Sequence, residues 1–164
     1  MDEDDADVVR RLLSYAEETA GGMMTPEAII LGPTDTVADA LAQLRRSDWV
    51  VSLATQVFVV DAPFRPPTGR FHGVVHMQHL LREAPQMELG DLVTDDPSVG
   101  PDASDRLVAE LLASYDLLAI AVLDDARRFL GTVTVDDVID RLLGEGWRTR
   151  HPSAQDSTAA VGGR

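Results

Sequence analysis

The sequence predicts an α+β protein built from two tandem strand-helix-strand-strand-helix repeats, preceded by one α-helix. The repeat is visible in two matched apolar strands, residues 57–61 and 120–124. Each is followed by a matched glycine-containing strand, residues 70–76 and 128–134. Repeats of this size bury their apolar faces against each other. We therefore expect two units that share one core.

The expected elements follow in order along the chain. An amphipathic helix is predicted over residues 8–20, halted by Gly21 and Gly22. In each repeat a glycine and a proline then precede a hydroxyl residue, Thr36 or Ser104, which is typical of a helix N-cap. The first helix of each repeat is expected to begin after that hydroxyl residue.

A second helix closes each repeat and is predicted to begin three residues after the glycine-containing strand, at His79 or Asp137. The repeats differ in length chiefly because the first carries an insertion, residues 63–67. A linker over residues 84–91 joins them. The polar, aperiodic stretch over residues 147–164 is expected to be a disordered tail.

Composition excludes several classes of function. The 164 residues include 14 Arg and no Lys against 28 Asp and Glu, a net charge of -14, so nucleic acid and anionic membranes would repel the chain. Without cysteine it has no disulfide, thiolate nucleophile or cysteine zinc site, and without lysine no Schiff base. The longest apolar run, residues 117–123, is far shorter than the ~20 residues of a membrane helix. We expect a cytoplasmic protein with no nucleic-acid partner.

Two polar pairs occupy matching positions at the start of the closing helices, Thr134 with Asp137 and His76 with His79. A hydroxyl at a strand end and a carboxylate in the next helical turn suit the two hydroxyls of a ribose, with the helix N-terminus near its phosphates. The pair also suits capping alone, in which Thr134 caps the helix and Asp137 favours its positive end. The spacing leaves both interpretations open.

These residues resemble a known family. A glycine, a hydrophobic residue, Ser or Thr, two residues and Asp at the end of such a repeat is similar to the CBS domain, which occurs in pairs; Gly131, Val133, Thr134 and Asp137 match it. The resemblance covers residues 23–143. Further segments are similar to the cytosolic region of MgtE magnesium transporters, namely residues 18–26, 114–116 and 131–138.

The resemblance implies a tandem CBS domain pair with regulatory function. Its expected divisions are an N-terminal helix ending an MgtE-type N-terminal domain (1–22), CBS domain 1 (23–84), CBS domain 2 (85–146) and the tail (147–164). It implies ATP or AMP bound at Thr134 and Asp137, a homodimer formed through the CBS domains, and control of an attached membrane domain of a magnesium transporter. The module would then lie at the cytoplasmic face of the membrane.

The resemblance also implies bound magnesium. Carried over by position, the metal-facing candidates are the Gly22 carbonyl, Asp116, Asp137, Asp140 and Glu145. Asp137 and Asp140 lie three residues apart on one predicted helix and so share a face, where like charges repel unless a cation binds. A solvated acidic helix face is the alternative interpretation.

The first repeat departs from the family pattern. His76 and His79 stand where a ribose-binding unit has a hydroxyl and an Asp, so we expect its nucleotide site to be lost or altered. Strict alternation puts His72 and His76 on one strand face, and with His79 they suggest a transition-metal site as one interpretation. Polar contacts at the helix start are the other.

The sequence favours regulation over catalysis. No serine lies in a nucleophile-elbow context, and no motif joins a serine to a histidine and an acid. We expect the cytosolic regulatory module of an MgtE-type magnesium transporter or of a soluble relative, sensing magnesium and adenine nucleotide. The alternative is a stand-alone adenine-nucleotide sensor without a magnesium role.

Overall fold

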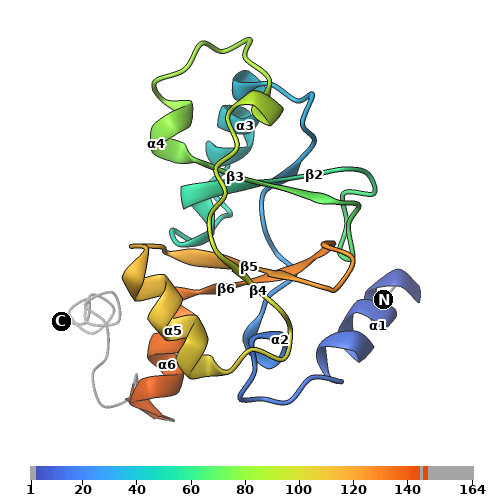
Figure 1. The fold of residues 1–164 in the computed structure, drawn as a ribbon, viewed down its shortest axis with the longest axis vertical. Helices are drawn as coiled ribbons and strands as arrows, with labels where there is room; N and C mark the ends of the chain where they lie inside the picture. Colours follow the sequence, from blue (N-terminus) through green and yellow to red (C-terminus); the bar gives the residue numbers. More distant parts are fainter. Residues whose placement is uncertain (1–2, 145, 148–164) are drawn as a thin grey trace, which may run out of the picture.

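The computed structural model describes residues 3–144 and 146–147, arranged as two small sheets that face each other with helices on their outer sides (Figure 1). The first repeat comprises β1 (Ile30–Leu31), α3 (Val37–Leu44), β2 (Gln56–Val60), β3 (Phe71–His76) and α4 (Met77–Leu80). The second comprises β4 (Ser98–Val99), α5 (Asp105–Ser114), β5 (Ala119–Leu123), β6 (Phe129–Thr134) and α6 (Val135–Leu143). Two short 3-10 helices, η1 (Leu53–Thr55) and η2 (Leu89–Asp91), lie between these elements.

The two sheets have the same topology. In each, the short first strand pairs in parallel with the second, and the second pairs antiparallel with the third, giving the orders β1-β2-β3 and β4-β5-β6. A bulge falls at the same place in both, between Val59 and Val60 in β2 and between Val122 and Leu123 in β5. The predicted α+β fold with two repeats is confirmed, and the two repeats also share the position of a bulge that was not predicted.

A shared core lies between the facing sheets. Phe58 and Phe71 from the first repeat meet Phe129 from the second, and the ring centroids of Phe58 and Phe129 are 4.8 Å apart. Phe58 and Phe129 are fully buried. Each sheet buries its outer face under helices of its own repeat, and in the second sheet Ala20 and Met24 from ahead of the first repeat add to the cover. The apolar strands are therefore covered on both sides and form continuous apolar runs in the sequence.

The repeats also exchange short segments. Thr25, ahead of the first repeat, pairs with Thr132 of β6, while Thr94, ahead of the second, pairs with Val74 of β3. The second pairing is reinforced by the Thr94 hydroxyl, which donates to the Val74 carbonyl at 3.0 Å. The sheet of each repeat is therefore paired with the segment that precedes the other repeat.

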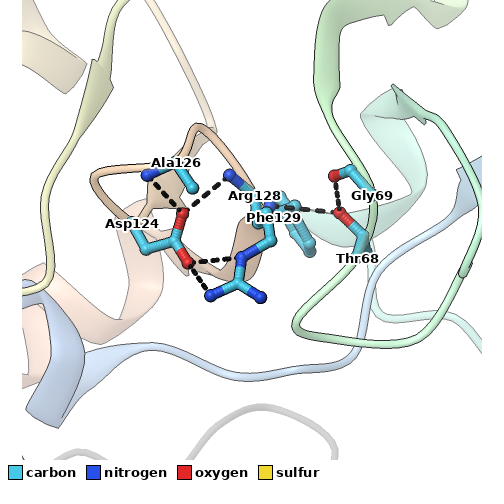
Figure 2. Close-up of polar contacts among 6 residues, drawn as sticks. All are labelled: Thr68, Gly69, Asp124, Ala126, Arg128 and Phe129. Carbon is cyan, nitrogen blue, oxygen red and sulfur yellow. Dashed lines mark hydrogen bonds and ion pairs between the residues drawn. The ribbon is translucent and has the colours of Figure 1, made fainter.

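The residue that follows the first-repeat insertion, Thr68, is hydrogen-bonded to the second repeat (Figure 2). Buried Thr68 accepts a hydrogen bond from the Phe129 amide at 3.1 Å, and its amide donates to the Phe129 carbonyl. Nearby, Asp124 closes the β5–β6 turn by accepting from the amides of Ala126 and Arg128 and from the Arg128 guanidinium. The turn thus uses ordinary aspartate turn chemistry.

The predicted helix over residues 8–20 is wrong in its bounds. The structure has α1 (Glu3–Leu12) and a separate α2 (Ala20–Met23), which contains both glycines and is capped by Thr19. A Cβ at Gly21 would lie 2.5 Å from the Tyr15 ring, and one at Gly22 would lie 2.2 Å from the Ala16 carbonyl oxygen. The two glycines, which the sequence analysis interpreted as a helix stop, therefore permit close packing of α2 on the preceding turn.

The closing helices begin two residues earlier than predicted, at Met77 and Val135. In both repeats the last strand residue, His76 or Thr134, is itself the N-cap, so no loop separates strand from helix. The divisions at residues 22, 84 and 146 remain predictions. The predicted tail lies outside the described residues apart from Trp147. No helix in the described part of the chain is long and apolar enough to cross a membrane.

Candidate nucleotide and cation site

Thr134 and Asp137 form a capping box at the N-terminus of α6. The Asp137 carboxylate accepts from the Thr134 amide at 3.0 Å and from its hydroxyl at 2.8 Å, both through Oδ2, while the Asp137 amide donates to Thr134 Oγ1 at 3.3 Å. The capping role is therefore present. The same hydrogen bonds hold the Asp137 carboxylate next to the helix N-terminus, where an acceptor for the ribose hydroxyls would be needed.

One cavity, of about 400 Å³, gathers part of the predicted metal set. It lies between α2 and α6, and its lining consists of Glu17, Gly22, Met23, Asp137, Asp140 and Arg141. Asp137 and Asp140 are half-buried residues of α6, and Gly22 comes from α2. Three of the predicted candidates, from segments more than 100 residues apart, therefore line one hollow.

The donor chemistry of this cavity suits magnesium. Carboxylate and carbonyl oxygens are the ligands that magnesium prefers, and it usually keeps several waters and takes only one or two carboxylates from a protein surface. Within the described residues, no group of three or more His, Asp or Glu side chains is arranged to hold a metal ion. Gly22, Asp137 and Asp140 could thus hold a hydrated ion, or one side of an ion shared with another surface.

Asp140 is held from the C-terminal side of the helix. The Trp147 indole N–H donates to Asp140 Oδ1 at 3.0 Å, across the turn at Gly144 where α6 ends. Hydrogen bonds of this kind orient carboxylates around metal ions. Trp147 therefore fixes one carboxylate oxygen of a predicted ligand.

The other two metal candidates are placed differently. Asp116 follows α5 in a left-handed backbone conformation, with φ of 53°, and lines a separate cavity of about 320 Å³ with His76 and Gln78. It does not line the cavity of Asp137 and Asp140. Glu145 lies outside the described residues.

The three histidines of the first repeat each face a carboxylate of their own. His72 Nε2 lies 2.6 Å from Asp61, His76 Nε2 lies 2.5 Å from Asp96, and His79 Nε2 lies 3.2 Å from Glu83. His72 is the extra residue of the β3 bulge, because Val59 pairs with Gly73 and Val60 with Phe71, which breaks the alternation that placed it with His76. The histidines therefore make separate polar contacts, and the transition-metal interpretation has no support among the described residues.

Sequence reasoning missed three residues around the cavity: Glu17, Arg141 and Trp147. Arg141 follows Asp137 by four residues on α6, so the helical period alone could have placed it on the same face. Glu17 and Trp147 reach the site through turns, and no local pattern indicates their position.

Comparisons with known proteins agree with the architecture. The family model described as "CBS domain" matches residues 20–85 and 89–144. The magnesium transporter MgtE of Thermus thermophilus is 33% identical over 144 residues, covering 87% of this chain and 31% of that protein. MgtE of Enterococcus faecalis is 31% identical over 140 residues, covering 84% and 29%. The chain spans about a third of the length of these relatives.

Solved structures give the same result. The cytosolic domain of the Mg2+ channel MgtE in complex with ATP matches with a TM-score of 0.73 and 32% identity, over 85% of this chain and 55% of that one. A CBS pair of a putative Mg2+ transporter from Shewanella oneidensis matches with a TM-score of 0.72 at 21% identity, which shows the fold alone. The chain therefore belongs to the CBS domain family, as a CBS domain pair homologous to the cytosolic domain of MgtE.

Proposed function

We propose that this CBS pair is the magnesium-responsive regulatory module of an MgtE-type transporter, or of a relative of one, at the cytoplasmic face of the membrane. The observation that supports the proposal most directly is the cavity in which Gly22, Asp137 and Asp140 come together. A module of this kind binds and signals, so we assign it no catalytic step.

The proposal is also supported by charge. At a net charge of -14, any association of this chain with itself or with another acidic surface works against electrostatic repulsion. A divalent cation between two such surfaces removes part of that repulsion and can be bound by a few carboxylates together with water. Cation binding can therefore switch the module between an open and a compact arrangement.

The test is a thermal melt in magnesium chloride and in sodium chloride of equal ionic strength. Simple screening acts equally in both salts. At about ten times the dissociation constant, specific binding adds ~1.4 kcal/mol, which raises the melting temperature by about 3–6 °C for a chain of this size. We expect that excess in magnesium. Equal melting temperatures in the two salts would contradict the proposal.

Variants localise the effect. An Asp137→Asn, Asp140→Asn double variant removes two charges from the cavity and should lose the magnesium-specific excess. The matched control is Asp91→Asn, Asp125→Asn, which removes two charges from exposed positions that do not line this cavity. The control should keep the excess.

Adenine-nucleotide binding is a second candidate, which can stand with or without a magnesium role. It is supported by the Thr134 and Asp137 geometry and by the ATP complex of the related MgtE cytosolic domain. In the first repeat the corresponding position is occupied by His76, which is bonded to Asp96. We therefore infer a single nucleotide site per chain, in the second repeat.

A further inference from the structure

The cavity proposed for magnesium already contains a positive charge. Arg141, one turn after Asp137 on α6, lines it together with Glu17, Asp137 and Asp140. A guanidinium group is charged at every physiological pH. A magnesium ion that enters the cavity therefore meets a fixed positive charge as well as carboxylates.

Arg141 is partly buried in the wall of this cavity. Its Nε is fully buried with no hydrogen-bond partner among the described residues. Buried polar atoms without partners are rare in native proteins, because the lost contact with water is not replaced. Hydrogen bonding of this Nε thus gives no reason for an arginine at this position, whereas the negative charge of the three carboxylates that line the same cavity does.

We propose that Arg141 is a built-in counter-ion that weakens magnesium binding in this cavity, and so sets the concentration of magnesium at which the module responds. This inference rests on the proposed function. Without a bound metal, Arg141 offsets part of the repulsion among Glu17, Asp137 and Asp140. When magnesium binds in this cavity, it meets the repulsion of the Arg141 guanidinium, and the affinity is lower than it would be beside a neutral side chain.

The experiment is a calorimetric titration of the protein with magnesium chloride at constant ionic strength. We compare the parent chain with Arg141→Gln, which removes the charge and keeps a polar side chain of similar length. Coulombic interactions at partly exposed sites predict an affinity about three- to tenfold higher in Arg141→Gln. Arg141→Lys keeps the charge and should bind magnesium about as the parent does.

The matched control is Arg106→Gln, which changes the net charge equally. Arg106 is exposed on α5, pairs with Glu110 at 3.0 Å and does not line the cavity. Arg106→Gln should leave the affinity for magnesium unchanged. Circular dichroism melts of all variants establish that each is folded before titration.

The outcomes separate this inference from the proposed function. If the parent binds magnesium and Arg141→Gln binds it equally or more weakly, the counter-ion role is wrong while the proposed function stands. If neither binds magnesium, both are wrong. A parallel titration with inorganic phosphate tests an anion-binding role: loss of phosphate binding in Arg141→Gln with unchanged magnesium affinity would overturn the proposal.

Discussion

Thr134 and Asp137 cap α6, and we propose that they also bind a ligand. Their capping box has a counterpart in the first repeat, where Thr36 and Asp39 cap α3 with the same pattern of hydrogen bonds. Capping accounts for the local geometry in both places. A ligand role of Asp137 is therefore tested by comparing the effect of its replacement on nucleotide affinity with that of replacing Asp39.

Replacement of Asp137 by alanine should weaken binding of ATP or AMP by about 1.5–3 kcal/mol, the scale of a hydrogen bond to a charged group. Calorimetric titration measures the effect. Asp39→Ala is the control, because it removes a matching capping carboxylate from the other repeat and should leave nucleotide affinity unaltered. Equal affinities in the parent and Asp137→Ala would place the nucleotide elsewhere.

Asp39 also predicts a pH dependence of stability. Hydrogen bonds from the backbone and hydroxyl of Thr36 lower the pKa of Asp39 below its ordinary 3.8. Because the folded-state pKa is the lower one, the stabilisation is present above pH 3.8 and is lost as the pH falls through the folded-state value. Asp39→Asn should thus be less stable than the parent in urea at pH 7, and the difference should shrink below pH 3.8. A constant difference at all pH values would contradict this role.

At the scale of elements, the segment exchange between repeats depends on two glycines. Gly131 of β6 lies under the segment before the first repeat, and Gly73 of β3 lies under the segment before the second. A Cβ would lie 2.7 Å from the Thr25 carbonyl oxygen at Gly131 and 2.7 Å from the Thr94 carbonyl oxygen at Gly73. Glycine in these strands is therefore required by the close approach of a second backbone.

Gly131→Ala should destabilise the protein by about 1–3 kcal/mol, the usual cost of inserting a methyl group into a tightly packed site. The displaced atoms are backbone at Thr25 and the Met24 side chain, so relief requires the exchanged segment to move. Urea unfolding measures the loss. Gly100→Ala, where a Cβ meets nothing within 4 Å, should cost much less; similar losses in both variants would refute the packing argument.

At the scale of the whole molecule, an apolar groove between α5 and α6 has no cover within the described residues. Its volume is about 530 Å³, and its walls include Leu112, Leu118, Val138, Ile139 and Leu142. Ile139 is 41% exposed and Leu142 is 74% exposed. A small CBS pair that leaves such side chains in water can bury them against a second copy of itself.

We therefore expect a homodimer in sedimentation experiments at about tens of micromolar, the range for modest interfaces. Leu142→Asp should shift the protein toward monomer, because a charge would be buried at the interface. Leu13→Asp, at an exposed position just after α1, is the control and should remain dimeric. A parent protein that sediments only as a monomer would rule out this assembly.

The sequence by itself determined the repeat and the local chemistry of this protein. The matched apolar strands, the glycine-containing strands and the residues Thr134 and Asp137 are short-range patterns, and short-range patterns report secondary structure and caps directly. The pairing of Asp137 with Asp140 on one helix face followed from the helical period in the same way.

Only the tertiary structure decided which distant residues share a site. The packing of α2 on the second repeat places Gly22 at the same cavity as Asp137 and Asp140 and leaves Asp116 at another cavity. Packing of α2 on the turn before it explains why Gly21 and Gly22 lie inside a helix, since Tyr15 and Ala16 leave no room for a Cβ. Contacts between segments more than 100 residues apart leave no period in the sequence, so their partners emerge only when the core is assembled.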